Sequence, residues 1–138
     1  MGDSYFIQRT YWQAIDYYDN ALEMDLRDQD YSLFQRAFAL GLLGRPQKKI
    51  ETLERLTANY PESNYLDDAY FEMGRSYMSL EKQQQAIGYF SRIVDEYPSS
   101  SYNKRALVQL GLIHYNLNNN QKAMNYYKRV VDDYPGTE

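Results

Sequence analysis

The sequence predicts an all-α protein, a right-handed α-solenoid in which antiparallel helix hairpins stack in a row. Two observations carry this prediction: the 138-residue chain repeats itself, and apolar residues within each repeat are spaced as on one face of an α-helix. A Tyr-Pro pair returns every 37 residues, at positions 60–61, 97–98 and 134–135. Small residues return at the same interval, namely Ala37, Gly74 and Gly111.

The third repeat illustrates why each repeat is expected to be one helical hairpin. Its first helix has apolar and small residues at helical spacing: Leu66, Ala69, Tyr70, Met73, Gly74 and Tyr77. A second run follows the polar residues 81–83: Ala86, Ile87, Phe90, Ile93, Val94 and Tyr97. Pro98 ends this run because a helix interior does not accommodate proline. Gly74 and Ala86 leave room for close helix approach, so bulky rings such as Phe90 are expected to interlock beside them.

The other repeats follow the same plan. In the second repeat, helices are expected over residues 31–43 and 46–59, and a further second helix is expected over 11–26. The chain is therefore expected to form a single array with a truncated first repeat and three more, at residues 1–28, 29–62, 63–99 and 100–138. The last helix keeps Val130 and Val131 where an earlier repeat would bury its apolar residues. Because terminal repeats normally present a polar outer face, the sequence is expected to be a fragment of a longer protein.

Composition excludes several classes of function. The net charge of −4, from 15 basic and 19 acidic residues, removes the attraction to phosphate on which nucleic-acid binding depends, so no nucleic-acid partner is expected. No apolar run reaches the roughly 18 residues of a spanning helix, so we expect no direct membrane insertion by this fragment. The absence of cysteine excludes disulfides and thiolate zinc sites, and it fits the cytosol and the periplasm equally well.

We predict no catalytic, cofactor-binding or metal-binding residues, and therefore no enzyme and no cofactor. His114 is the only histidine, and it occupies the position that Tyr77 holds one repeat earlier. Such an exchange is typical of a packed position, so packing is preferred to general-base catalysis, and one histidine cannot build the usual zinc clusters. Three carboxylate pairs, at residues 67–68, 95–96 and 132–133, are interpreted as solvated charge on helix surfaces.

These residues resemble the tetratricopeptide repeat family, whose signature combines large, small and aromatic residues on one helix with alanine, an aromatic residue and proline on the next. Two repeats match closely, through Tyr70, Met73, Gly74, Tyr77, Ala86, Phe90 and Pro98, and through Leu107, Leu110, Gly111, His114, Ala123, Tyr127 and Pro135. The second repeat matches less well and has Lys49 where alanine is usual. The opening repeat keeps only Gly2, Tyr5, Ala14, Tyr18 and Ala21.

The repeat length departs from the family standard of about 34 residues, and the excess lies between the proline and the next first helix. The phrase Tyr-Pro-x-Ser-x-Tyr at 60–65 and 97–102 is similar to that of the bacterial cell-envelope branch of the family. This resemblance implies a periplasmic or outer-membrane-associated protein that takes part in envelope assembly, with the cytoplasm as the alternative.

The resemblance also implies binding of a protein or peptide. Successive hairpins rotate slightly, which lines first helices along a concave face. On that face we predict these peptide-binding residues: Tyr31, Phe34, Phe38, Asp68, Phe71, Arg75, Met78, Arg105, Val108, Leu112 and Tyr115. The aromatic residues would anchor a peptide, while Arg75 or Arg105 would orient an acidic group or a chain terminus.

The alternative is a structural role. The same aromatic residues could pack against the rest of the protein or against another copy, including self-association through uncapped terminal repeats. The residues of the carboxylate clamp found in the chaperone-binding subfamily are replaced here by mostly aromatic or aliphatic residues, so recognition of chaperone tails is not expected.

Overall fold

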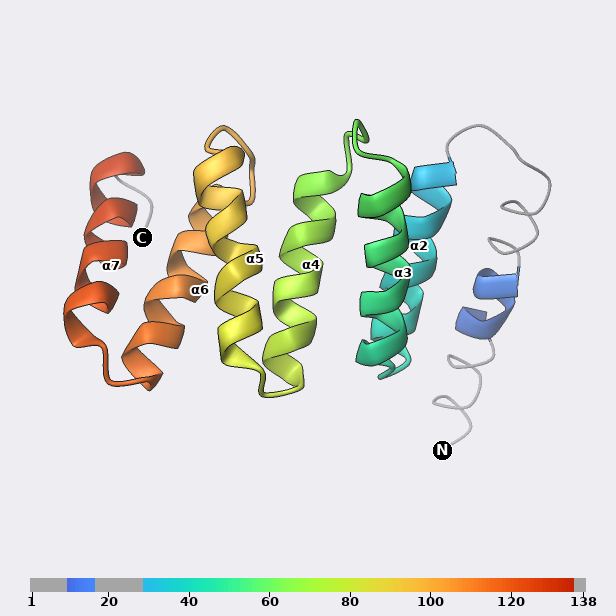
Figure 1. Ribbon diagram of the computed structural model, residues 1–138, viewed down its shortest axis with the longest axis horizontal. Coiled ribbons are helices and arrows are strands. Elements are labelled where there is room, and N and C mark those ends of the chain that lie inside the picture. The colour runs from blue at the N-terminus through green and yellow to red at the C-terminus, as the bar shows by residue number, and fades with distance from the viewer. Residues whose placement is uncertain (1–9, 17–28, 136–138) are drawn as a thin grey trace. The chain divides into compact units, whose positions relative to one another are not determined.

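The computed structural model of the chain describes residues 10–16 and 29–135. Within these residues all regular secondary structure is helical (Figure 1), which confirms the predicted all-α class. Residues 10–16 are helical and are followed by six helices: α2 (Gln29–Leu42), α3 (Pro46–Asn59), α4 (Leu66–Ser79), α5 (Gln83–Glu96), α6 (Asn103–Asn116) and α7 (Asn120–Asp133). No helix among the described residues is both long enough and apolar enough to span a bilayer.

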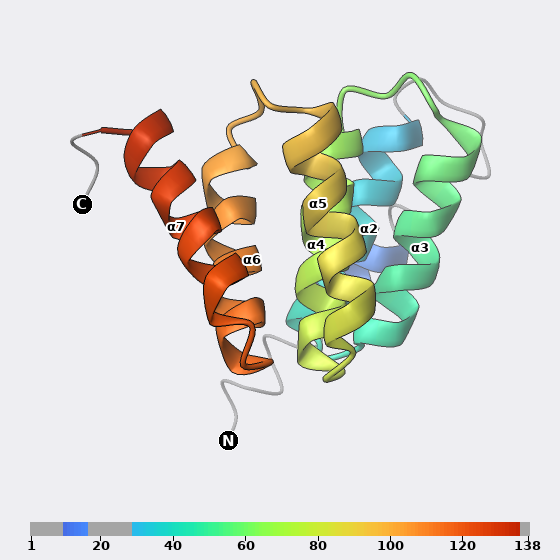
Figure 2. The same ribbon diagram turned by 60° about the vertical axis from the view of Figure 1, so that its left-hand side comes forward.

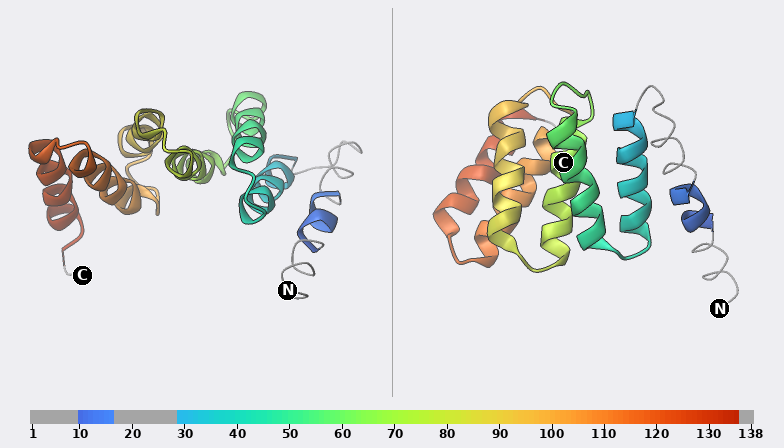
Figure 3. Two further views of the ribbon diagram at one scale, coloured as in Figure 1. Left: turned by 90° about the horizontal axis from the view of Figure 1, so that it is seen from below. Right: turned by 45° about the vertical axis from the view of Figure 1, so that its right-hand side comes forward.

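The helices follow one another as antiparallel hairpins, as the sequence predicts. The chain forms two compact units, divided between Ala69 and Tyr70 inside α4. In the first unit α2 packs against α3, and in the second unit α6 packs against α5 and α7 (Figures 2 and 3). Of the predicted opening repeat, only residues 10–16 are described: Ala14 is half-buried and Ile15 is buried, while Gly2, Tyr5, Tyr18 and Ala21 lie outside the described residues.

Each unit has its own apolar core, made by the residues that the helical spacing selects. The largest side chains below 2% exposed in the first unit are Leu33, Leu40, Ile50, Leu53 and Leu56. Those in the second unit are Met73, Phe90, Ile93, Leu107, Leu110 and Ile113. The predicted close approach at Gly74 is confirmed, because a Cβ atom there would lie 2.6 Å from Cε1 of Phe90. Gly111 has the same relation to Tyr127, at 2.5 Å.

The unusual Lys49 of α3 is accommodated by a second departure in α2. Lys49 is only 8% exposed, although it is charged. A Cβ atom on Gly41 would lie 3.0 Å from Cδ and 3.1 Å from Nζ of Lys49, so glycine gives this side chain space that a larger residue would narrow. In the two later repeats the equivalents of Lys49 are alanines, Ala86 and Ala123. The equivalents of Gly41 in those repeats are the larger residues Met78 and Tyr115. Each hairpin therefore combines one small and one larger residue at these two positions.

The turn inside each hairpin has the same backbone conformation in all three repeats. One residue takes a positive φ each time: 73° at Gly44, 60° at Glu81 and 64° at Asn118. After α4, the N–H of Lys82 donates to the carbonyl of Tyr77 at 2.8 Å, and that of Glu81 donates to Met78 at 3.0 Å. This is the Schellman pattern, in which glycine is preferred at the left-handed position. Glu81 is therefore the least suited residue of the three.

Replacing Glu81 with glycine is expected to raise the free energy of unfolding by about 0.5–1 kcal/mol. A side chain in the left-handed conformation costs about 1–2 kcal/mol, and the added freedom of glycine in the unfolded chain cancels part of the gain. Urea denaturation followed by circular dichroism measures the difference. Gly44→Ala is the matched control and should lower stability, because its φ is 73° while no atom lies within 4 Å of the new Cβ. Loss of stability in Glu81→Gly would contradict this interpretation.

Candidate functional site

The predicted binding residues occupy four equivalent positions along the first helices α2, α4 and α6. Tyr31, Asp68 and Arg105 open the three rows, since each lies 37 residues from the next. The second position holds Phe34, Phe71 and Val108. The third position holds Phe38, Arg75 and Leu112. The last position holds Met78 and Tyr115, and its equivalent on α2 is Gly41. Their exposure differs from helix to helix.

Helix α2 presents a row of exposed apolar side chains. Tyr31 is 41% exposed, Phe38 43% and Leu42 52%, whereas Phe34 is half-buried. The loop residue Tyr65 covers Phe34: the two rings stack with centroids 5.8 Å apart and an interplanar angle of 22°. Tyr65 also contacts Tyr31 at 5.6 Å. The ring of Tyr65, from the loop after α3, therefore packs against two of the aromatic residues of α2.

Helix α4 carries a different arrangement. Phe71 is only 5% exposed and meets Phe90 edge-on, with centroids 5.5 Å apart. Tyr102 lies 4.9 Å from the same ring, so Phe71 supports the surface from below and does not stand open on it. Arg75 is exposed and donates through Nη1 to a carboxylate oxygen of Glu72 at 3.1 Å. Asp68 and Met78 are half-buried.

Helix α6 combines a cation with two exposed apolar residues, one of which is the most exposed apolar residue among the predicted binding residues. Arg105 is exposed, with its guanidinium 5.8 Å from the ring centroid of Tyr102. Leu112 and Tyr115 are 43% and 62% exposed, and Val108 is half-buried. The structure therefore brings Phe71 and Arg105 together through Tyr102, a residue that the sequence analysis does not assign to the site.

The two tyrosines that end the recurring phrase, Tyr65 and Tyr102, are the site residues missed from the sequence. Their backbone is fixed by the serine two positions earlier: the N–H of Tyr65 donates to Oγ of Ser63, and that of Tyr102 to Oγ of Ser100, both at 3.0 Å. Serine hydroxyls stabilise turns in this way. The signal in the sequence that points to these two tyrosines is the recurrence of Tyr-Pro-x-Ser-x-Tyr after 37 residues.

His114 has the surroundings of a packed residue. It is 6% exposed, and its ring stacks on Tyr126 with centroids 5.5 Å apart and an interplanar angle of 11°. Tyr77, its equivalent, stacks on Tyr89 at the same 5.5 Å and at 8°. Within the described residues, the polar side chain that contacts His114 is Asn119, whose Nδ2 lies 3.5 Å from Nδ1 of the histidine. No group of three or more His, Cys, Asp or Glu side chains that could hold a metal occurs within residues 10–16 and 29–135.

Exchanging His114 for tyrosine is expected to remove a loss of stability at acidic pH. Burial, and secondarily the charge of Lys122, lower the pKa of His114. The unfolded chain therefore binds a proton as the pH falls through about 6.5 while the native protein does not, so stability is highest above that pH and declines below it. Unfolding free energies measured from neutral to acidic pH should decline less steeply in His114→Tyr. Identical slopes in both proteins would reject this role for His114.

The helical repeats match a known protein family. The tetratricopeptide repeat family matches residues 31–63, 68–100 and 105–137, which is most of the chain. The chain belongs to the tetratricopeptide repeat family. The matched segments leave residues 64–67 and 101–104 between them, and these short segments contain Tyr65 and Tyr102. The residues added to the family repeat thus supply the rings that cover Phe34 and Phe71.

Solved structures of other proteins share this fold. A crystal structure of MamA superposes with a TM-score of 0.76 at 22% identity, over 99% of this chain and 75% of that one. A second MamA structure gives 0.75 at 22% identity, over 99% and 70%. YrrB, described as a TPR protein with an unusual peptide-binding site, gives 0.72 at 18% identity, over 98% and 66%. No curated protein matches the sequence.

Proposed function

We propose that this chain is a non-catalytic interaction module that binds a partner peptide or protein segment on its first helices, the concave face of the predicted solenoid. The observation that carries the proposal is the exposure of large apolar side chains on first helices. On α6 these are Leu112 and Tyr115, and on α2 they are Tyr31 and Phe38, of which Phe38 and Leu112 occupy equivalent positions. Membership of the tetratricopeptide repeat family supports the same function.

The chemistry of α6 indicates what such a partner would offer. Exposed aromatic residues lose little conformational freedom on binding and bury a large area, which makes them frequent anchors at interfaces. Arg105 stands at the start of the same row, where it can pair with a carboxylate of the partner. The buried Phe71 keeps a supporting role, because it holds the Tyr102 ring beside Arg105.

Selection of peptides from a displayed random library on the purified chain, followed by titration of the selected peptides, tests this proposal. The variants Leu112→Ser and Tyr115→Ser should each weaken binding about tenfold, as expected for anchor residues. Met124→Ser is the matched control, since Met124 is 66% exposed but lies on the second helix α7. Equal binding by the α6 variants, or loss of binding in the α7 control alone, would reject the first-helix surface.

Self-association is the second candidate, and the surface of α7 favours it. Among the residues of α7, only Ala123 is buried, while Met124 and Val131 are 66% and 68% exposed. A second copy could cover these side chains. Light scattering over a range of protein concentrations would show a dimer that Val131→Glu disrupts. A monomer at all concentrations would exclude this candidate.

A location in the bacterial cell envelope is part of the proposal. It is supported by the phrase Tyr-Pro-x-Ser-x-Tyr, whose serine and second tyrosine form the loop contacts described above. Fractionation of cells that produce the full-length protein should place it in the periplasm or with the outer membrane. Recovery in the cytoplasm alone would reject this location and leave the binding proposal untouched.

A further inference from the structure

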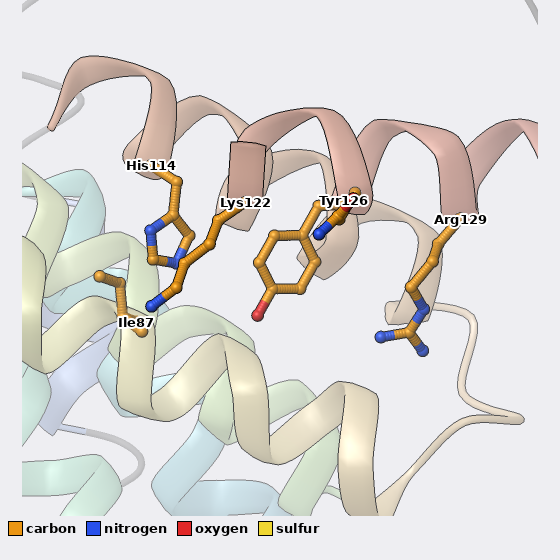
Figure 4. A pocket seen from close by; sticks show the side chains of 6 residues that line it. Ile87, His114, Lys122, Tyr126 and Arg129 are labelled. Atoms are coloured by element: carbon orange, nitrogen blue, oxygen red, sulfur yellow. The ribbon is translucent and has the colours of Figure 1, made fainter. Parts of the chain in front are cut away.

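A cavity of about 410 Å³ lies in the second unit, away from the first-helix row. It is lined by one residue of α5, one of α6 and four of α7: Ile87, His114, Lys122, Asn125, Tyr126 and Arg129. The α7 residues are three or four positions apart and therefore share one face of the helix. Figure 4 shows Lys122, Tyr126 and Arg129 extending from α7 into the same space, toward the helix that carries Ile87. A cavity of this size can hold a side chain or a short peptide segment.

The lining carries two cations and no carboxylate. Lys122 and Arg129 form no hydrogen bond or ion pair with any residue in the described part of the chain. Between them lie the stacked rings of Tyr126 and His114, 5.5 Å apart. Burial and the nearby charge of Lys122 lower the pKa of His114, so the imidazole is neutral at pH 7 and adds a flat ring without a further charge. The cavity thus combines positive charge at its ends with flat rings in the middle.

In the preceding repeat the equivalent arginine is neutralised by a residue of its own helix. Arg92, the equivalent of Arg129, donates through Nε to a carboxylate oxygen of Glu96 at 2.7 Å. Its guanidinium also lies 4.4 Å from the ring centroid of Tyr70. Asp133 stands at the position of Glu96 but is one methylene shorter, and it forms no ion pair with Arg129. The arginine of the last repeat is therefore available to a ligand, whereas that of the third repeat is not.

The second repeat provides another internal comparison. A smaller cavity of about 270 Å³ is lined there by Arg36 and by residues of α3 at positions 48, 51, 52 and 55. Lys48 and Arg55 are the equivalents of Lys122 and Arg129, but Glu51 stands in place of Asn125 and supplies a negative charge within the cavity. Thr52 replaces Tyr126, so the flat ring is missing as well. The uncompensated positive charge and the ring occur together in the last repeat.

The spacing of the two cations indicates the form of the ligand. Lys122 and Arg129 are seven residues apart, which corresponds to about 10 Å along a helix axis. One compact anion would not span that distance, whereas an extended peptide places every second side chain on one face and covers about 13 Å in four residues. We infer that this cavity binds an acidic peptide segment with two carboxylates four residues apart and an apolar or aromatic side chain midway between them. This site is separate from the first-helix surface proposed above.

Fluorescence anisotropy with a labelled peptide tests the inference directly. The probe is a short synthetic peptide with two glutamates four positions apart and a phenylalanine midway between them, and the control peptide has glutamine in place of both glutamates. The acidic probe should bind and the glutamine peptide should not. Lys122→Gln and Arg129→Gln should each weaken binding about tenfold, since each removes a charge-assisted contact. Added salt should weaken binding of the probe to the unaltered protein.

A change that copies the second repeat gives the sharpest variant. Asn125→Glu places a carboxylate where Glu51 stands in that repeat, and it should abolish binding of the acidic probe. Met124→Ser, next to it on α7 but outside the cavity, should leave binding unchanged. All four positions are exposed on α7, so circular dichroism should show an unaltered fold.

The outcomes separate this inference from the first-helix proposal. Probe binding that survives Asn125→Glu but is lost in Leu112→Ser would overturn the cavity and leave the first-helix surface standing. If millimolar inorganic phosphate displaced the probe completely, the cavity would be assigned to a compact oxyanion, and the inference that it binds a peptide would be wrong. Equal affinity for the acidic and glutamine peptides would overturn it as well.

Discussion

Phe90→Ala is expected to lower the free energy of unfolding by about 3–5 kcal/mol, the range for deleting a fully buried aromatic ring. The side chain of Phe90 is 0% exposed, and its ring meets that of Phe71 at 5.5 Å. It also fills the space beside Gly74, where no Cβ atom separates the two helices. Removing the ring leaves a cavity that the hairpin α4–α5 cannot close without shifting its helices. Urea denaturation followed by circular dichroism measures the loss.

Phe38→Ala is the control for this prediction. Phe38 is the same residue type but is 43% exposed on α2, so its loss should change stability by about 0.5 kcal/mol or less. If Phe90→Ala costs no more than Phe38→Ala, the packing of Phe90 against Gly74 does not hold the second unit together.

Gly74→Ala is expected to lower the free energy of unfolding by about 1–2 kcal/mol, although alanine is the better helix former by about 1 kcal/mol. The new Cβ atom would lie 2.6 Å from Cε1 and 2.7 Å from Cζ of Phe90. Because Phe90 is fully buried, its ring cannot turn away without displacing other core residues. The overlap therefore outweighs the gain in helix propensity.

Two other glycines in helices provide matched controls for Gly74. Gly88 on α5 is exposed, and a Cβ atom there meets nothing within 4 Å, so Gly88→Ala should raise stability by about 0.5–1 kcal/mol. At Gly111 the Cβ atom would lie 2.5 Å from Cε1 of Tyr127, but Tyr127 is only half-buried and can move toward solvent. Gly111→Ala should therefore have an effect between the other two.

A double-mutant cycle decides whether the clash with Phe90 is the cause. In a Phe90→Ala background the added methyl group has space, so Gly74→Ala should become neutral or stabilising. An unchanged cost in that background would mean that Gly74 is required for another reason. Both variants are measured by the same urea denaturation, so the coupling energy follows directly from four curves.

Much of the fold could be predicted from the sequence because the constraints are local and repeated. The spacing of Leu66, Ala69, Tyr70 and Met73 fits only a helix, and Pro98 cannot lie inside one. Glycine in a helix needs a packing reason, and Gly74 has one in Phe90. These features depend on near neighbours along the chain or on the adjacent helix of the same hairpin, which is why they could be predicted.

The candidate site was less predictable because it depends on side chains that come from elsewhere. Helical spacing places Phe71 in the same row as Phe34 and Val108, but it does not reveal that Tyr102 folds back over the ring. The cavity beside α7 depends on smaller differences still. Asp133 in place of Glu96 removes one methylene and with it an ion pair, and the spacing of apolar residues says nothing about such a change.

The fit between Gly41 and Lys49 limits how such a protein can evolve by exchanging its parts. A second helix carrying Lys49, moved into the third repeat, would meet Met78 where it now meets glycine. The reverse exchange would bring Ala86 opposite Gly41 and leave a void. Recombination that cuts within a hairpin therefore produces mismatched halves, whereas recombination that cuts at the loops after each Tyr-Pro pair transfers both partners together. The heritable module of this chain is the hairpin.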